Sequence, residues 1–261
     1  MSKINSLKVS IITVCFNSEH TIEDTIRSVS NQSYNNIEYI IIDGGSVDGT
    51  QKLLNKFKDN IDVLVCEPDD GIYDAMNKGV ALASGDIVGI LNSDDYYLND
   101  EVIASVVNKF TSNPLCDVVL GHVDFVTSDN LVKPVRRYFS KFFSSWQLFF
   151  GLMPPHPGSF IRKSVYEKEG LYKINYRIAA DFEYFVRVFL KKKYNYVKID
   201  KCLVRMRMGG ISTAGLTSNL LASNEMVRAL NENNVYSNKF LVSFRLPVKL
   251  AQLFLFKLGI K

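Results

Sequence analysis

Five aspartates follow apolar, strand-like segments of the sequence, where their carboxylates could act on one ligand: Asp43, Asp69, Asp70, Asp94 and Asp95. Asp94 and Asp95 are adjacent and come after the apolar run at residues 87–91. Adjacent carboxylates repel each other, so such a pair usually faces a cation or solvent. Mg²⁺ or Mn²⁺ prefers oxygen ligands of this kind and can hold phosphate groups at the same time. Taken alone, an Asp-Asp pair is more often a solvated turn.

The spacing of apolar residues predicts the elements that would bring these aspartates together. Short apolar runs predict strands at residues 9–14, 37–42, 63–66, 87–91 and 118–121. Helical periodicity between the runs predicts helices, with Ser18, Asp48 and Asp70 placed to cap three of them. Alternating strands and helices of this length predict an α/β fold with a parallel sheet, whose strands all end at one ligand-binding edge.

A nucleotide fits that edge, with its base and ribose near Asp43 and its diphosphate held by a metal on Asp94 and Asp95. A Rossmann dinucleotide site is excluded because no Gly-x-Gly-x-x-Gly follows the first strand, and a P-loop is excluded because its Gly-Lys-Ser/Thr signature is missing. The four cysteines are widely separated, without a Cys-x-x-Cys pair. This spacing excludes zinc and thioredoxin-type sites and indicates reduced thiols in a cytoplasmic protein.

The net charge of +4 over 261 residues is small and does not indicate binding to nucleic acid. The distribution of charge along the chain says more about its partners. Acidic residues are missing from residues 130–166 and 233–261, whereas both stretches carry Lys and Arg. An anionic substrate or surface near the second half of the chain is therefore expected. The first residues, MSKINSLK, lack the apolar core of a signal peptide, and no apolar run approaches the roughly 18 residues of a spanning helix.

Several motifs, in order, resemble those of family 2 glycosyltransferases. They are residues 9–17, DGGSVDGT at 43–50, EPDDGIYDAMNKG at 67–79, GDIVGILNSDD at 85–95, and an acceptor-half match at 156–187. The resemblance implies the GT-A fold, a Rossmann-like, mostly parallel sheet, here with a C-terminal helical extension. The type is that of bacterial enzymes that assemble O-antigen, colanic acid and similar surface polysaccharides. The chain departs from the family by lacking a proline in the first turn and by having Gly44 where an aspartate is common.

The resemblance also implies roles for individual residues. A nucleotide-sugar pocket would be formed by Thr13, Asn17, Asp43, Asp69, Lys78 and Asp94, with Asp43 on the base and Lys78 near phosphate. Mn²⁺ or Mg²⁺ would bind Asp94 and Asp95, with Asp95 as the direct ligand, and Asp181 would be the catalytic base. The metal would neutralise the departing diphosphate while the base takes the proton of an acceptor hydroxyl. One displacement with one base inverts the configuration, so an α-linked donor gives a β-linkage.

Three further residues are secondary candidates. Glu183 is a fallback base, although it lies roughly 200° around a helix from Asp181, so the two cannot both face the site. His156, between two prolines, either touches the diphosphate or acceptor or is a surface histidine. Arg207 belongs with residues 209–213 to a loop expected to close over the donor.

Aromatic residues of the second half leave several interpretations open. Phe182, Phe185 and Phe189 recur at helical spacing and are expected in the core. Trp146, with its neighbours Phe149 and Phe150, could form an acceptor platform, a membrane-touching loop or a core patch.

The domain prediction is a catalytic domain at residues 1–215, followed by a basic amphipathic helical segment at 216–261. Within the catalytic domain, residues 1–125 form the nucleotide-sugar half and residues 126–215 the acceptor half. The basic, apolar tail suits the anionic inner face of a membrane. The alternative is a helix packed on the domain and kinked at Pro247.

The sequence thus predicts an inverting, metal-dependent glycosyltransferase that moves glucose or galactose from a UDP-sugar. The predicted acceptor is a saccharide of the undecaprenyl-diphosphate-GlcNAc type, extended during O-antigen, lipopolysaccharide or capsule biosynthesis. The enzyme is expected to be peripheral on the inner face of the cell membrane. A nucleotidyltransferase or a non-catalytic sugar-nucleotide-binding module is the alternative.

Overall fold

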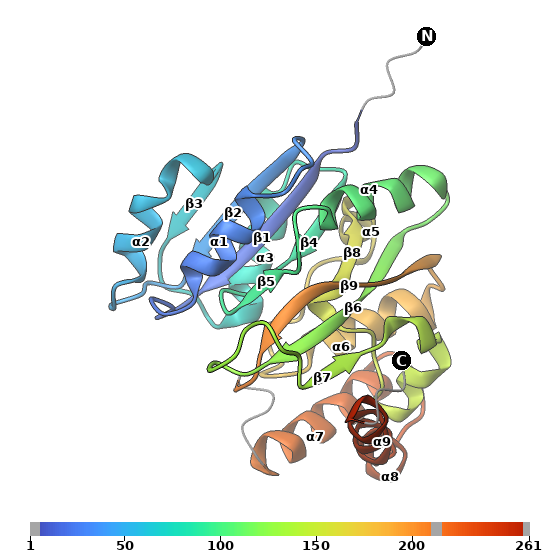
Figure 1. The fold of residues 1–261 in the computed structure, drawn as a ribbon. Helices are drawn as coiled ribbons and strands as arrows, with labels where there is room; N and C mark the ends of the chain where they lie inside the picture. The colour runs from blue at the N-terminus through green and yellow to red at the C-terminus, as the bar shows by residue number, and fades with distance from the viewer. Residues whose placement is uncertain (1–5, 210–215, 258–261) are drawn as a thin grey trace.

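The computed structural model describes residues 6–209 and 216–257, and its centre is a mixed sheet (Figure 1). Among these residues the strand order is β3-β2-β1-β4-β8-β6-β9-β5, with β7 paired to β6. The strands are β1 (Val9–Cys15), β2 (Ile37–Asp43), β3 (Val63–Cys66), β4 (Ile87–Ile90), β5 (Asp95–Tyr97), β6 (Val118–Val126), β7 (Arg136–Tyr138), β8 (Ser159–Arg162) and β9 (Tyr196–Arg207). Strands β1 to β4 run parallel, and β8 pairs antiparallel with β4 and with β6. The five predicted strands are confirmed.

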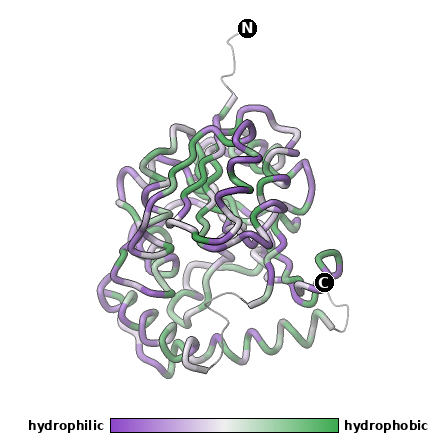
Figure 2. The backbone as a smooth tube through the Cα atoms, turned by 90° about the vertical axis from the view of Figure 1, so that its left-hand side faces the viewer, coloured by the Kyte–Doolittle hydropathy of each residue, from purple (hydrophilic) through white to green (hydrophobic). Residues whose placement is uncertain are grey.

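Two helical layers cover the sheet. On one face lie α1 (Ile22–Ser30), α2 (Thr50–Lys56) and α4 (Val102–Ser112), and on the other lie α3 (Ile72–Leu82), α5 (Lys163–Glu169), α6 (Ala180–Phe185) and the π-helix η5 (Val186–Lys191). Consecutive strand residues point to opposite faces, so Ile11 and Ile12 are both fully buried but in different cores. Figure 2 shows the hydrophobic strands gathered inside hydrophilic outer segments. The expected burial of Phe182, Phe185 and Phe189 is confirmed.

None of the three residues predicted as helix caps occupies the N-cap of its helix. Helix α1 has Thr21 at its N-cap, and Ser18 contributes its carbonyl oxygen rather than its hydroxyl. Helix α3 has Gly71 at its N-cap with φ +106°, a conformation that glycine adopts readily and aspartate does not. Helix α2 has Gly49 at its N-cap, and Asp48, one residue earlier, accepts a 2.9 Å hydrogen bond from the backbone N–H of Thr50.

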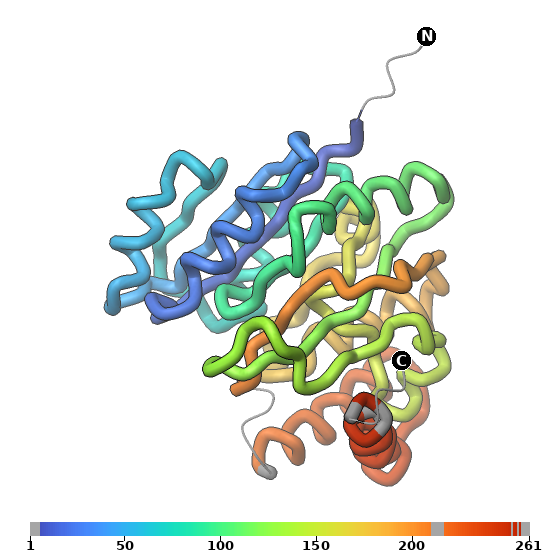
Figure 3. Tube along the Cα trace, viewed as in Figure 1, coloured from blue at the N-terminus to red at the C-terminus, as the bar shows by residue number. Residues whose placement is uncertain are grey.

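The C-terminal helices gather beside β7, at the end of the molecule away from β3 (Figure 1). They are α7 (Leu216–Glu232), α8 (Lys239–Ser243) and α9 (Arg245–Lys257). Short 3₁₀ helices occur earlier in the chain, outside this group: η1 (Lys58–Asn60), η2 (Ser140–Phe142), η3 (Ser145–Phe150) and η4 (His156–Gly158). Figure 3 shows the tail lying against the much earlier β7 region, and α9 packs on β7. Pro247 does not kink a helix: it lies in the first turn of α9, where its missing N–H costs little.

None of the described helices combines the length and apolar character needed to cross a bilayer. The tail is packed on the domain through Val242 and Arg245, which are both buried, while Phe240 and Phe254 remain exposed. The packed tail that was one alternative is therefore present, and it still presents apolar side chains outward.

Candidate active site

The turn after β4 carries the adjacent aspartates, and hydrogen bonds from α1 hold it in place. The backbone N–H of Asp95 donates a 3.0 Å hydrogen bond to the carbonyl oxygen of Asn92, which closes the turn. The Thr25 hydroxyl lies 2.9 Å from the carbonyl oxygen of Ser93 and 2.7 Å from that of Asp95. These contacts hold both carboxylates at the carboxyl end of β4, at the edge of the parallel strands.

The residues of this turn fit a divalent cation. Asp95 has no exposed surface, and its Oδ2 accepts a long hydrogen bond of 3.3 Å from the Asn92 amide. Within the described residues, Asp95 Oδ1 and Asn92 Oδ1 are buried without any hydrogen-bond partner. Burial and the neighbouring charge of Asp94 raise the pKa of Asp95 well above its usual range. Buried acceptor oxygens without donors suit Mg²⁺ or Mn²⁺ chemically.

A cation here would need ligands from outside the protein. Among the described residues, no group of three or more His, Cys, Asp and Glu side chains could hold a metal ion. Phosphate oxygens would complete the shell, as is common for Mg²⁺.

Arg207, at the end of β9, contacts the turn that carries the paired aspartates. Its Nη1 donates a 2.7 Å hydrogen bond to the carbonyl oxygen of Asp94, and its Nη2 pairs with Asp24 of α1. Its guanidinium lies 5.2 Å from the ring centroid of Tyr96. Arg207 therefore lies beside the turn of the paired aspartates, but it is the last residue of β9 and not part of the predicted loop. The loop predicted at residues 209–213 lies mostly outside the described residues.

The predicted nucleotide pocket is organised around Asp43 in a way that the sequence did not indicate. Asp43 has no exposed surface, and its carboxylate accepts hydrogen bonds from Ser46 and, at 3.3 Å, from the Gln51 amide. Asn17, at a left-handed φ of 49°, accepts a 3.0 Å bond from the backbone N–H of Val47. In this structure Asp43 and Asn17 shape the loop after β2, and Asp43 does not face solvent as a direct base contact would require.

Thr13 and Lys78 are engaged with other parts of the protein. Thr13 is fully buried, with its hydroxyl 3.1 Å from that of Tyr39, so it does not line an open pocket. The Lys78 ammonium lies 2.9 Å from Glu67 and 3.4 Å from Asp74, and it donates to the carbonyl oxygen of Pro68. The carboxylates therefore compete with the phosphate contact that was expected of Lys78.

Asp69 occupies space that Gly44 leaves open at the tip of β2. Its Oδ1 accepts a 2.9 Å hydrogen bond from the backbone N–H of Gly71, and its Oδ2 lies where a Cβ on residue 44 would be. An aspartate at position 44, common in the family, would collide with this carboxylate. The glycine at position 44, where the family often has aspartate, thus leaves room for the Asp69 carboxylate.

Asp181 lies on α6, and its carboxylate contacts residues from both halves of the chain. Its Oδ1 accepts a 2.8 Å hydrogen bond from the Phe182 N–H and lies 3.4 Å from the hydroxyl of Tyr73. Burial raises the pKa of Asp181 to about 6, against these two hydrogen bonds, which lower it. A carboxylate of this pKa is ionised at neutral pH yet basic enough to accept a proton.

The segment before Asp181 is anchored by a residue that sequence analysis missed. Glu225 of α7 is buried and accepts hydrogen bonds of 2.8, 2.9 and 3.0 Å from the backbone N–H groups of Arg177, Ile178 and Ala179. Three such bonds to one carboxylate fix the start of α6, and with it Asp181. Nothing in the local sequence around Glu225 signals this role.

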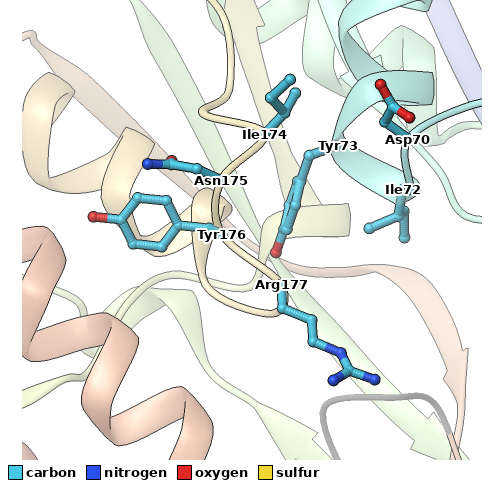
Figure 4. A pocket seen from close by; sticks show the side chains of 8 residues that line it. Asp70, Ile72, Tyr73, Ile174, Asn175, Tyr176 and Arg177 are labelled. Atoms are coloured by element: carbon cyan, nitrogen blue, oxygen red, sulfur yellow. The ribbon is translucent and has the colours of Figure 1, made fainter.

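A cavity of about 260 Å³ opens between α3 and the segment that Glu225 anchors. It is lined by Asp70, Gly71, Ile72, Tyr73, Ile174, Asn175, Tyr176 and Arg177. Figure 4 shows Tyr73 between the α3 side and the Ile174–Arg177 side. Because the Tyr73 hydroxyl also lies near Asp181, this cavity adjoins the candidate base.

Glu183 and His156 are built into the interior. Glu183 is fully buried and lies 2.9 Å from the Arg187 guanidinium and 3.1 Å from the Lys173 ammonium. Because both ion pairs engage its carboxylate away from solvent, Glu183 is a poor candidate for the fallback base. The surface alternative for His156 is wrong: it is buried, with Nε2 3.0 Å from the Tyr172 hydroxyl. Burial lowers the pKa of His156 to about 4, so it is neutral at neutral pH.

Comparisons with known proteins decide the family. The profile described as "Glycosyl transferase family 2" matches residues 10–170. An uncharacterized glycosyltransferase of Mycobacterium tuberculosis is 35% identical over 185 residues, which are 70% of this chain and 69% of that protein. The chain belongs to glycosyltransferase family 2. A PGL/p-HBAD biosynthesis glycosyltransferase of Mycobacterium bovis is 28% identical over 183 residues, 69% of each chain.

Solved structures agree on the GT-A fold of this family 2 glycosyltransferase. S. aureus TarS 1-349 in complex with UDP-GlcNAc superposes with a TM-score of 0.64 at 17% identity, over 85% of this chain and 67% of that one. The mannosyltransferase PcManGT from Pyrobaculum calidifontis, in complex with GDP-Man and Mn²⁺, also gives 0.64, at 16% identity, over 88% of this chain and 64% of that one. The predicted fold and enzyme class are therefore confirmed.

Proposed function

We propose that this glycosyltransferase transfers glucose or galactose from a UDP-sugar to a lipid-linked acceptor with inversion, using Mn²⁺ or Mg²⁺. The observation that carries the proposal is the contrast between two carboxylate sites. Asp95, with Asn92, has buried oxygens that lack donors, as suits a cation. Asp181 has a pKa raised by burial to about 6, as suits a base.

In this mechanism the protein binds the donor diphosphate beside Asp94 and Asp95. The bound metal would supply Lewis-acid stabilisation of the negative charge on the departing diphosphate. Arg207 adds positive charge at the same turn. Asp181 accepts the proton of the attacking acceptor hydroxyl, and Glu225 keeps the segment before Asp181 in place. A single displacement from an α-linked donor gives a β-linked product.

The acceptor part of the proposal is a saccharide on a polyprenyl diphosphate, of the undecaprenyl-diphosphate-GlcNAc type, in O-antigen, lipopolysaccharide or capsule assembly. An exposed aromatic ladder supports a position on the inner face of the membrane. In this ladder Trp146 is 6.0 Å from Phe150, Phe150 is 5.9 Å from Phe244, and Phe244 is 5.3 Å from Phe240, measured between ring centroids. Exposed aromatic side chains near basic residues favour an anionic bilayer surface. The division of the chain near residues 125 and 215 stays a prediction.

The deciding experiment measures transfer from UDP-, GDP- and dTDP-sugars to a synthetic lipid-diphosphate-GlcNAc, with Mn²⁺ or with EDTA. Wild-type protein is compared with Asp95→Ala and Asp181→Ala, and the anomeric configuration of the product is read by NMR. Metal-dependent transfer of one UDP-hexose into a β-linkage, lost in both variants, supports the proposal. An α-linked product, or transfer that survives in EDTA, would refute the inverting or the metal-dependent part.

A further inference from the structure

A buried arginine at the start of α9 has no acidic partner among the residues that the structure describes. Arg245 is only 1% exposed. Its Nη1 contacts Met226 Sδ at 2.6 Å, and its Nη2 contacts the Asn219 carbonyl oxygen at 3.0 Å and Ser223 Oγ at 3.1 Å. These groups of α7 are all neutral, and Arg245 Nε has no partner among the described residues. The guanidinium charge is thus buried without a counter-charge, which is costly.

Two more cations lie close to Arg245. Lys249 is one turn further along α9 and so lies on the same face of the helix. Arg136 comes from β7, the strand on which α9 packs. Burial and the positive charges of Arg245 and Arg136 lower the pKa of Lys249 to about 8. Arg136 Nε is also buried without a partner in the described structure, and its guanidinium lies 4.6 Å from the ring centroid of Phe125.

Two partly buried arginines of the chain, in contrast, have a carboxylate partner. Arg137 pairs with Asp124 through bonds of 2.6 and 2.8 Å, and Arg187 pairs with Glu183 at 2.9 Å. Among the described residues, by contrast, no ion pair involves Arg136, Arg245 or Lys249. The stretches that contribute all three, residues 130–166 and 233–261, contain no acidic residue at all. An anion from outside the protein would relieve the repulsion among them.

We propose that Arg136, Arg245 and Lys249 form a binding site for the phosphate group of a membrane-borne phosphate ester. Lys249 is half-buried and would meet the ligand first, with the two guanidinium groups behind it. Arginine and lysine together suit phosphate oxygens through charge-assisted hydrogen bonds. Phe244, next to Arg245, belongs to the exposed aromatic ladder, so an apolar chain attached to the phosphate has a surface to lie on.

Two sources share this chemistry: an isoprenyl diphosphate and the headgroup of an anionic phospholipid. The inference rests on the proposed function only where the ligand is taken to be the diphosphate of the acceptor. Three probes separate the sources: pyrophosphate, geranyl diphosphate, and vesicles of phosphatidylglycerol compared with phosphatidylcholine. Binding is measured by calorimetry for the soluble probes and by co-sedimentation for the vesicles, with the full chain.

The test variant is Lys249→Gln, and the matched control is Lys239→Gln, which removes the same charge from an exposed position on the neighbouring helix α8. Thermal melting checks that each variant is folded, and Arg136→Gln is a second test should Lys249→Gln fail to fold. We expect at least one probe to bind about tenfold more weakly to Lys249→Gln and almost unchanged to Lys239→Gln. Loss with geranyl diphosphate points to an isoprenyl diphosphate, and loss with phosphatidylglycerol vesicles alone points to a headgroup.

Equal weakening in the two variants would mean general charge attraction and would overturn the site. Binding of none of the probes by the wild-type protein would overturn it as well. Hydrolysis of UDP-sugar by the wild-type protein, which needs no acceptor, is measured in parallel. That activity tests the proposed function independently, so the two proposals can fail separately.

Discussion

The hydroxyl of Tyr73 lies 3.4 Å from Oδ1 of Asp181, across 108 residues of sequence, and donates a shorter bond of 2.6 Å to the carbonyl oxygen of Ile178. Tyr73 lies in the first turn of α3, in the first half of the chain, and Asp181 lies in the first turn of α6, in the second. This contact joins the half that carries the predicted nucleotide motifs to the candidate base. It also makes the protonation of Asp181 sensitive to a residue on another element.

The first prediction concerns Asp181 itself. Asp181→Asn keeps the shape of the side chain but cannot accept a proton, so kcat should fall about 10²- to 10⁴-fold. The base works when ionised, and burial raises the pKa of Asp181 to about 6. In wild-type protein, kcat/KM should therefore be constant above that pH and fall about tenfold per pH unit below it. A rate in Asp181→Asn close to that of wild type would contradict the assignment.

The second prediction concerns Tyr73. The Tyr73 hydroxyl has one proton, which the Ile178 carbonyl oxygen and Asp181 Oδ1 share, and its hydrogen bond to Asp181 lowers the pKa of that carboxyl. Tyr73→Phe removes that bond, so the acidic limb of the pH–rate profile should move to higher pH. Tyr176→Phe is the matched control, because Tyr176 lines the same cavity but its hydroxyl bonds to Glu232. An identical limb in wild-type protein and Tyr73→Phe would show that the contact does not tune the base.

The strands and the Asp94–Asp95 turn could be predicted because their signal is local. A run of apolar residues sets each strand, and parallel connectivity then brings the strand ends together. Helix starts were less predictable, since the φ of +106° at Gly71 prevails over the capping preference of Asp70. Position in the sequence also cannot reveal that the Thr13 side chain is buried on one face of the sheet, where its hydroxyl meets that of Tyr39.

The contacts that shape the site are tertiary, and the sequence does not encode them locally. Glu225 reaches the segment before Asp181 from 46 to 48 residues away. The need for a glycine at position 44 follows only from the structure, because the Asp69 carboxylate occupies the space that a side chain there would fill. Such pairings depend on how helices and loops pack over the sheet, which periodicity leaves undetermined.

The third prediction concerns how much the buried Asp95 carboxylate destabilises the protein when no cation is bound. Because burial and Asp94 disfavour the charged form of Asp95, Asp95→Asn should stabilise the metal-free protein by about 1 kcal/mol, a rise in Tm of roughly 2–4 °C. It should also abolish the rise in Tm that Mn²⁺ gives wild-type protein. Asp94→Asn is the comparison: Asp94 is less buried, so it should lose the Mn²⁺ effect with a smaller gain. A full Mn²⁺ shift in Asp95→Asn would argue against Asp95 as a ligand.

The fourth prediction separates a structural role of Glu183 from a catalytic one. Glu183→Gln leaves the Arg187 guanidinium and the Lys173 ammonium without their buried carboxylate, and should lower the free energy of unfolding by about 3 kcal/mol. Glu167→Gln, in an exposed pair with Lys163, should change stability little. Denaturant melts measure both variants. The activity per folded molecule should be preserved in Glu183→Gln, and a loss of several orders of magnitude would return it to the list of bases.

The fifth prediction uses the single tryptophan of the chain. Trp146 is 57% exposed and lies at one end of the aromatic ladder, so its fluorescence reports directly on contact with lipid. Vesicles of phosphatidylglycerol should shift its emission to shorter wavelength, and added salt should weaken the shift because the attraction is partly electrostatic.

Substitution within the ladder tests whether the aromatic side chains carry this binding. Phe240 is 71% exposed, and burial of one such side chain in lipid is worth about 1.5 kcal/mol or more, so Phe240→Ser should weaken vesicle binding about tenfold. Leu115→Ser alters an apolar residue that is 84% exposed and lies between α4 and β6, away from the ladder, and this variant should bind as wild type does. Equal binding by Phe240→Ser and Leu115→Ser would assign vesicle attraction to charge alone. The aromatic ladder would then be free to meet a different ligand, such as the apolar part of the acceptor.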